Sequence, residues 1–260
     1  MLQLRTFGGL RVSASACDRG GGSLGRKPLA LVALMARADG LTISRDRALG
    51  LLWPETDQDR ARNALNQVVF LLRRRLGASA VTPTRYDIAL DADSWVLDVT
   101  EFERAIAGGA FTQAVVSCQG SFLDGFYVPD AGEFERWVEQ ERSGLRRAYL
   151  NALERLALTA RDRGDDRAAA EWWQHLARVE PLSPRIVIAA AHALAVTGEY
   201  AAALALTRSH EVRIRSELEA AVDPRIATLA KELRDHFRLG GRTDFVRRFP
   251  ASGQPTTPGA

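Results

Sequence analysis

Two glycines in the second half of the chain lie 34 residues apart, and the segments that follow them are alike. Gly164 and Gly198 each precede an acidic residue and then a run of three alanines, at 168–170 and 201–203. A period of 34 residues is typical of tetratricopeptide repeats, in which small side chains let paired helices approach closely. Because only about two such units are visible, a generic helical bundle is the alternative interpretation.

The sequence around these repeats also favours helix. From Asp98 to about Arg238 helix-forming residues dominate, and glycine or proline marks the breaks. The segment after Gly240 is rich in Gly, Pro, Thr and Ser, which predicts a disordered tail. We therefore predict an all-α, tetratricopeptide-like domain over residues 98–239 and a disordered tail over 240–260.

The first 97 residues show a different order of elements. Apolar residues alternate around Gly8 and Gly9, Ser44 is a good helix N-cap, and Gly77 ends a long amphipathic segment. The expected elements are strands within residues 2–12, a Gly-rich loop over 17–25, helices over about 29–37, 45–52 and 57–76, and a β-hairpin over 81–90. Strands, three helices and a hairpin in this order predict a winged helix over residues 1–97. The fold class is thus mostly α, with an α+β N-terminal domain.

The charge is distributed unevenly between these regions. Although the chain of 260 residues carries a net charge of only +3, residues 1–97 hold 14 Lys/Arg against 9 Asp/Glu, a net of +5. Residues 98–239 hold 18 against 22, a net of −4. A basic first third beside an acidic remainder favours a polyanionic partner for the N-terminal domain. The alternative is that this charge serves only solubility.

The third predicted helix has two distinct faces. At 100° per residue, one third of its circumference is apolar and forms the predicted core face, with Ala61, Leu65, Val68, Val69, Leu72 and Leu76. The opposite face collects Arg60, Asn63, Gln67 and Arg74, flanked by Asn66 and Phe70. Arg, Asn and Gln can make paired hydrogen bonds to guanine or adenine in the major groove. Glu and Lys, which usually fill a merely solvated face, are absent from this helix.

This helix therefore supplies the predicted contacts with double-stranded DNA. The residues expected to contact bases are Arg60, Asn63, Asn66, Gln67 and Arg74. The residues expected to contact phosphates, which give affinity and orientation, are Arg62, Arg73, Arg75 and, near the hairpin tip, Arg85. The competing interpretation is a surface helix that is rich in arginine for no functional reason.

Several motifs, taken in order, resemble a known family. The N-terminal ones are Arg26-Lys27-Pro28-Leu29, Leu49 to Pro54, and Leu72-Arg73-Arg74 followed by Leu76-Gly77. They are similar to the DNA-binding domain of SARP-type bacterial transcriptional activators. The later ones are Glu101-Phe102-Glu103, Gly120 to Gly125, Glu133 to Trp137 and Gly198-Glu199-Tyr200, and they resemble the bacterial transcriptional activator domain of the same family.

The resemblance covers about residues 2–235 and implies a function. It implies a winged helix of the response-regulator type, fused to tetratricopeptide-like helices. It also implies binding to direct repeats near promoters as a side-by-side homodimer, and recruitment of RNA polymerase. The chain departs from the family at Leu71, where many relatives carry a polar or basic residue, and at Phe70, an aromatic on the outer face. Part of this face could therefore meet protein instead of DNA.

Other functional classes lack sequence support. Gly20 to Pro28 lacks the Gly-Lys-Ser/Thr order of a phosphate loop, and the cysteines and histidines show no metal-ligand spacing, so no metal or cofactor is expected. The longest apolar run is too short to cross a bilayer, and Cys17 and Cys118 fit a reducing cytoplasm. We expect a cytoplasmic protein without enzyme activity. The alternative function is an interaction scaffold whose helical repeats bind protein and whose winged helix is degenerate.

Overall fold

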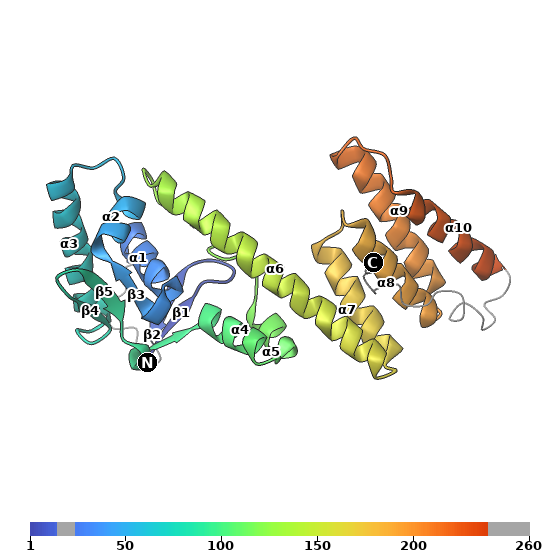
Figure 1. Ribbon diagram of the computed structural model, residues 1–260, viewed down its shortest axis with the longest axis horizontal. Coiled ribbons are helices and arrows are strands. Elements are labelled where there is room, and N and C mark those ends of the chain that lie inside the picture. The colour runs from blue at the N-terminus through green and yellow to red at the C-terminus, as the bar shows by residue number, and fades with distance from the viewer. Residues whose placement is uncertain (15–23, 239–260) are drawn as a thin grey trace, which may run out of the picture. The chain divides into compact units, whose positions relative to one another are not determined.

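The computed structural model describes residues 1–14 and 24–238 of the chain, which fall into two compact units (Figure 1). The first unit comprises residues 1–152 and the second begins at residue 153. Most of the predicted loop over 17–25, and the predicted tail over 240–260, lie outside the described residues. The predicted boundary between residues 97 and 98 falls within the first unit and stays a prediction.

Two small sheets form in the first unit. One has the order β2-β1-β6, in which β1 (Leu2–Arg5) pairs antiparallel with β2 (Arg11–Ala14) and parallel with β6 (Trp95–Leu97). The other has the order β3-β5-β4, in which β5 (Asp87–Leu90) pairs antiparallel with both β3 (Thr42–Ser44) and β4 (Val81–Pro83). Strands β4 and β5 are the hairpin expected over 81–90.

Three helices lie between these strands in the sequence, as expected for a winged helix. They are α1 (Arg26–Arg37), α2 (Arg45–Leu52) and α3 (Gln58–Leu76). Ser44 caps α2, and its side chain accepts a hydrogen bond from the backbone N–H of Arg47. Helix α1 begins at Arg26, before Pro28, because a proline within the first helical turn gives up an N–H that has no partner inside the helix. The predicted winged-helix fold is confirmed.

The sequence gives no indication of β3 and β6, each of which is three residues long. Segments this short carry too few alternating residues for a strand pattern, and their place is set by pairing with β5 and β1. Short 3-10 turns precede both of them, at Asp39–Leu41 and Ala92–Ser94.

The apolar core of the first unit continues past the winged helix. It includes residues of α4 (Asp98–Ala107), α5 (Phe111–Ser117) and the first part of α6 (Gly132–Asp162), which itself extends into the second unit. The ring of Phe7, which follows β1, meets the edge of the Phe102 ring of α4 at 5.4 Å between centroids. The segment between α5 and α6 joins this core through Phe122 and Leu123, both almost fully buried.

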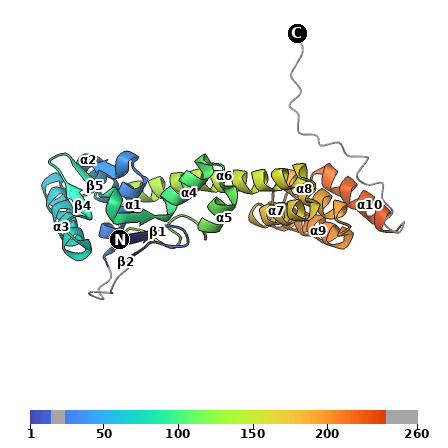
Figure 2. The same cartoon turned by 90° about the horizontal axis from the view of Figure 1, so that it is seen from below.

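The second unit is all-helical, as the repeat pattern predicts. Helices α7 (Asp166–Val179), α8 (Pro184–Val196), α9 (Tyr200–Glu217) and α10 (Pro224–Arg238) pack as successive neighbours (Figure 2). Gly164 and Gly198 both adopt positive φ, 76° and 85°, immediately before α7 and α9. Buried alanines at the crossings, among them Ala170, Ala191 and Ala203, let the helices approach closely.

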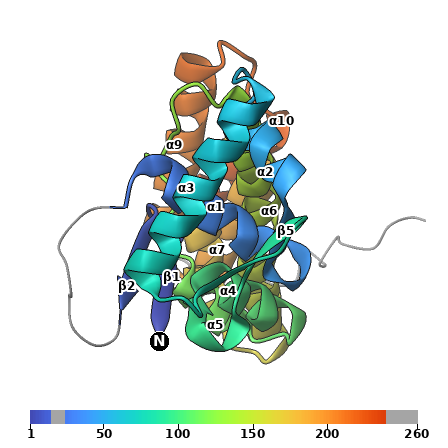
Figure 3. The same cartoon turned by 90° about the vertical axis from the view of Figure 1, so that its left-hand side faces the viewer.

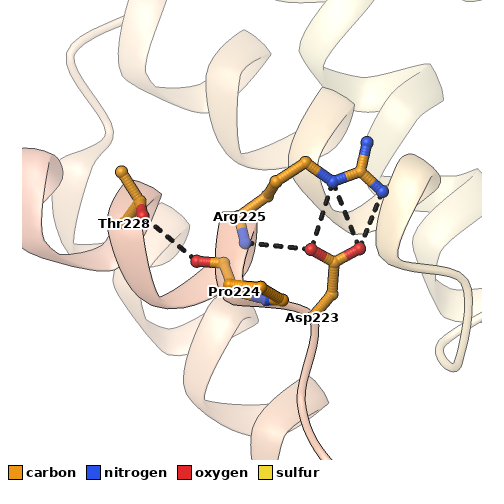
Figure 4. A network of polar contacts seen from close by, with 4 residues as sticks. All are labelled: Asp223, Pro224, Arg225 and Thr228. Carbon is orange, nitrogen blue, oxygen red and sulfur yellow. Dashed lines mark hydrogen bonds and ion pairs between the residues drawn. The ribbon is translucent and has the colours of Figure 1, made fainter.

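The start of α10 shows how the last break in the sequence is built (Figure 4). The Asp223 carboxylate accepts hydrogen bonds from the backbone N–H of Arg225 at 2.9 Å and from its guanidinium Nη2 at 2.7 Å. Pro224 occupies the first helical position, and Thr228 donates its hydroxyl hydrogen to the Pro224 carbonyl. The hydrogen bonds from the Arg225 guanidinium, and after them the one from its backbone N–H, together lower the pKa of Asp223 to about 2.

Candidate nucleic-acid interface

Helix α3 is fixed at both ends and along one face. At its start, the Asp57 carboxylate accepts hydrogen bonds from the backbone N–H groups of Asp59 and Arg60, at 3.1 and 3.3 Å. At its end, Gly77 takes a φ of 105°, which only glycine adopts readily. The buried face consists of Ala61, Leu65, Val69 and Leu72. Within the first unit, α3 crosses in front of α1 with its other face outward (Figure 3).

The outward face carries most of the residues predicted to contact DNA. The exposed ones are Arg60, Arg62, Asn63, Asn66, Gln67, Arg74 and Arg75, together with Phe70. Leu71, which the sequence pattern groups with Phe70, is half-buried and is therefore not part of this exposed surface. We call the exposed residues Arg60, Asn63, Asn66, Gln67, Phe70 and Arg74 the α3 ridge.

The exposed arginines of α3 retain free hydrogen-bond donors. Arg62 lies 3.8 Å from the Asp59 carboxylate, and both side chains are largely exposed, so this ion pair adds little. Within the described parts of the chain, no carboxylate forms an ion pair with Arg60, Arg74 or Arg75. These guanidinium groups are thus available to a ligand with many acceptors.

Arg73 differs from the other arginines of α3. Its side chain is half-buried, and its Nη1 donates a hydrogen bond of 2.9 Å to the backbone carbonyl of Val81 in β4. This contact ties the end of α3 to the hairpin. The sequence pattern does not distinguish Arg73 from its neighbours, because position on a helical wheel does not show which group lies opposite.

The hairpin places a cation and an aromatic ring at its tip. Arg85 and Tyr86 are both exposed, and the Arg85 guanidinium carbon lies 5.2 Å from the centre of the Tyr86 ring. The Thr84 hydroxyl oxygen accepts a hydrogen bond of 2.9 Å from the backbone N–H of Asp87, which fixes the turn. Arg85 therefore projects from an ordered turn, as a wing contact requires.

Arg45 joins these elements, although no sequence pattern singles it out. Its Nη1 donates a hydrogen bond of 2.9 Å to Oδ1 of Asn66 in α3, and its Nε donates one of 3.0 Å to the carbonyl of Thr84. The bond from Arg45 orients the Asn66 amide and leaves its NH₂ group as the free donor. The available signal was weak, since Arg45 is only one more arginine at the start of α2.

A second group of charged side chains in the first unit is paired internally. Arg37, at the end of α1, pairs with Glu103 of α4 at 2.7 Å and with Glu141 of α6 at 2.8 Å. These three side chains border a cleft of about 350 Å³ with apolar walls that include Phe102 and Leu145. Because the charges already satisfy one another, this group stabilises the packing of the three helices.

The described residues show no sign of metal or membrane chemistry. Within residues 1–14 and 24–238, no cluster of three His, Cys, Asp or Glu side chains is placed to hold a metal ion. No helix in the same ranges has both the length and the apolar character needed to cross a lipid bilayer. Buried His210 donates its Nδ1–H to the Pro181 carbonyl oxygen, 2.8 Å away, while its Nε2 has no hydrogen-bond partner among the described residues.

Comparison with known structures supports the fold. The chain is similar to Mycobacterium tuberculosis EmbR, solved in complex with a low-affinity phosphopeptide, with a TM-score of 0.60 and 17% sequence identity. The similarity covers 94% of this chain and 66% of the EmbR chain, so this chain spans just under two thirds of that length. Comparison with curated proteins gave no match.

Comparison with protein families identifies the longer part of the chain. Residues 90–234 match the family described as the bacterial transcriptional activator domain. The match begins within β5, covers α4 to α9 and ends within α10. Together with the winged helix that precedes this region, it confirms the resemblance drawn from the sequence motifs. The chain therefore belongs to the family of SARP-type bacterial transcriptional activators that carry the bacterial transcriptional activator domain.

Proposed function

We propose that this protein is a sequence-specific DNA-binding activator of transcription, which recruits RNA polymerase at promoters. Residues 1–97 are the DNA-binding domain, residues 98–239 are the activator domain and residues 240–260 are a tail. Two copies bind side by side on direct repeats in double-stranded DNA. The protein acts in the cytoplasm, where the bacterial chromosome lies, and it needs no cofactor.

One observation supports this proposal above all: the α3 ridge is exposed, free of acidic side chains and, apart from Phe70, polar. An α-helix fits the major groove of B-DNA, and Arg, Asn and Gln match the hydrogen-bonding edges that guanine and adenine present there. The predicted base contacts therefore lie on one face of one helix. Arg62 and Arg75 flank this face and are placed to reach phosphates on either side.

The contact between Arg45 and Asn66 determines which group of Asn66 is available to a base. With Oδ1 held by Arg45, Asn66 offers chiefly its amide NH₂ to a base. A donor at this point matches an acceptor such as N7 of a purine. Arg45 therefore acts as a positioning residue for the ridge, and it also ties the ridge to the wing.

The proposal is tested by selecting duplexes from a random pool with the full chain. The expected result is enrichment of a defined sequence that occurs twice in the same orientation, about 10 base pairs apart, as two protomers on one side of the helix require. Failure to enrich any duplex, even at low salt, would overturn DNA binding.

Activation is tested separately, by transcription in vitro. A promoter that carries the selected sequence, purified bacterial RNA polymerase and the full chain should give more transcript than the same reaction without the chain. The control is a promoter with a scrambled site. Tight binding without any increase in transcript would leave a DNA-binding protein and remove the claim of polymerase recruitment.

An interaction scaffold is the second candidate function. The observation in its favour is that exposed apolar side chains occur in the second unit, namely Val212, Leu218 and Phe237. These residues suit a protein partner, and such a partner is compatible with DNA binding by α3. The scaffold alone would stand if the full chain bound no duplex and formed a stable complex with a protein.

A further inference from the structure

Phe70 is an exposed aromatic residue in the middle of a polar surface. Its side chain is 66% exposed, and it lies on α3 between polar ridge residues. Gln67 precedes it by three positions and Arg74 follows it by four, so both lie within one helical turn on the same face. A phenyl ring held in water at such a site gains nothing for folding, which points to a role in binding.

The surroundings of Phe70 do not suit a protein partner. Protein-binding surfaces are contiguous apolar patches, usually of several hundred Å². The nearest neighbours of Phe70 on the helix face are Asn66, Gln67 and Arg74, all polar and all exposed. The other large apolar side chains that are exposed in the described part of the first unit lie on other elements, among them Tyr86 at the tip of the hairpin. Among the described residues of α3, Phe70 is thus the one large apolar side chain that is exposed.

The major groove of DNA offers an isolated apolar group that matches it. Thymine presents a 5-methyl group there, surrounded by hydrogen-bond donors and acceptors, and phenylalanine is among the side chains that pack against it. A ridge that reads base edges with Asn66, Gln67 and Arg74 would bring Phe70 to the same depth of the groove. The arrangement of polar residues around Phe70 therefore matches the arrangement of hydrogen-bonding groups around the thymine methyl group.

We propose that Phe70 recognises thymine by packing against its 5-methyl group, and that each half-site contains a thymine at the corresponding position. This inference rests on the proposed DNA binding and adds a specificity-determining residue to it. Phe70 makes no hydrogen bond to a base, so its contribution depends on the methyl group alone. That property separates its effect from those of the polar ridge residues.

The test removes the methyl group without changing base pairing. Each thymine of the selected duplex is replaced in turn by deoxyuridine, and the affinity of the full chain is measured by fluorescence anisotropy. At one position in each half-site, the wild-type chain should bind about four-fold more weakly, the factor that corresponds to burying one methyl group. The variant Phe70→Ala should bind the thymine and deoxyuridine duplexes equally well.

A matched variant controls for general effects of losing a phenyl ring. Phe237 in α10 is 62% exposed, similar to Phe70, and lies in the second unit. Phe237→Ala should keep both the wild-type affinity and the four-fold response to deoxyuridine. Because Phe70 is exposed, Phe70→Ala should retain the wild-type melting temperature, which is checked by circular dichroism.

The outcomes separate this inference from the proposed function. If the chain binds a selected duplex but no thymine-to-deoxyuridine change alters its affinity, the role of Phe70 is wrong and DNA binding stands. The same conclusion follows if Phe70→Ala shows the same four-fold response as the wild type. If the chain selects no duplex, DNA binding and the thymine contact fail together.

Discussion

At the scale of single residues, Asp98 connects the winged helix to the helices that follow it. Its carboxylate accepts hydrogen bonds from the backbone N–H groups of Thr6 and Phe7, at 2.7 and 3.0 Å, and from the Thr6 hydroxyl at 2.6 Å. Thr6 is fully buried, so water cannot replace these bonds. Hydrogen bonds to a charged acceptor contribute more than neutral ones, and a buried donor left without a partner is costly.

The change Asp98→Asn tests this connection. The amide keeps the volume of the carboxylate but turns an NH₂ group toward donors, so the free energy of unfolding should fall by about 2–3 kcal/mol. The measurement is urea denaturation of the full chain. The matched control is Asp124→Asn, which changes an exposed carboxylate in the segment that follows α5 and should alter the stability very little. Equal effects of the two changes would contradict the account.

Cys118 provides a prediction that depends on pH. Burial and, to a smaller extent, the negative charge of Asp98 together raise the pKa of its thiol to about 11. Only the thiolate reacts with alkylating reagents, and a pKa of about 11 leaves roughly one molecule in ten thousand ionised at pH 7. In a Cys17→Ser variant, alkylation by iodoacetamide should therefore be about a hundred-fold slower at pH 7 than that of a free cysteine.

The pH dependence of the same reaction tests whether the pKa of the Cys118 thiol is raised. The alkylation rate should keep rising above pH 10, where an ordinary thiol with a pKa of about 8.5 is almost fully ionised. Adding urea to unfold the chain should restore the ordinary profile, because the thiol then becomes solvated. A rate that levels off near pH 9 in the folded chain would show that the thiol is not buried as described.

At the scale of elements, α3 contains arginines with different expected roles. Arg74 lies on the ridge, whereas Arg75 is exposed beside it, and we propose that it contacts a phosphate. We expect Arg74→Ala to lower the affinity for the selected duplex by about 1–3 kcal/mol and to relax the preference at one base pair. Arg75→Ala should weaken binding to all duplexes alike and reduce the slope of log affinity against log salt by about 1.

These two variants control for each other, since both remove one exposed guanidinium from the same helix. Binding of each is measured with the selected and a scrambled duplex at two or more salt concentrations. If Arg74→Ala and Arg75→Ala behaved identically on both duplexes, the assignment of the ridge to base contacts would be wrong. Gln67→Ala should likewise lower the affinity for the selected duplex and relax the preference at one base pair, and because Gln67 is uncharged the salt slope should not change.

The sequence predicted the long amphipathic elements well, for a physical reason. Helix α3 has 19 residues, an acidic N-cap and a glycine at its end, so periodicity and capping indicate the same segment. Strands β3 and β6 were missed, because three residues carry no readable period and their formation depends on partners distant in sequence. Long-range pairing of this kind is not encoded in any local pattern.

The candidate site was likewise predicted only in part from the sequence. Periodicity correctly placed the exposed residues of the ridge, such as Asn63 and Gln67, since helical geometry alone decides which side faces outward. It did not reveal that Arg73 binds the Val81 carbonyl or that Arg45 holds Asn66. Both contacts join separate elements, so they appear only when α2, α3 and the hairpin are assembled.

At the scale of the whole molecule, the winged helix shares its core with residues of the predicted activator domain. Gly8 donates its N–H to the Ser121 carbonyl, and Leu123 donates its N–H to the Thr6 carbonyl at 2.7 Å. Gly8 and Gly120 lie so close that a Cβ on Gly120 would come within 2.9 Å of the Gly8 Cα. The end of β1 is therefore packed against residues that lie beyond the predicted boundary.

A truncation series tests this sharing. Residues 1–152 should unfold cooperatively on heating, whereas residues 1–97, which lack Asp98, Phe122 and Leu123, should melt at a markedly lower temperature or remain unfolded. Loss of a buried leucine alone typically costs 2–5 kcal/mol, a large part of the stability of a small domain. The melting temperatures of the two fragments are compared by calorimetry. Equal melting temperatures would show that the winged helix folds independently.

Chemical protection of guanine shows whether the α3 ridge enters the major groove of the selected duplex. Dimethyl sulfate methylates N7 of guanine, which is exposed only in the major groove. On the selected duplex, the full chain should protect one or more guanines in each half-site, and Arg74→Ala should lose protection at one of them. Binding that leaves every guanine N7 reactive, or protection that is unchanged in Arg74→Ala, would contradict the account.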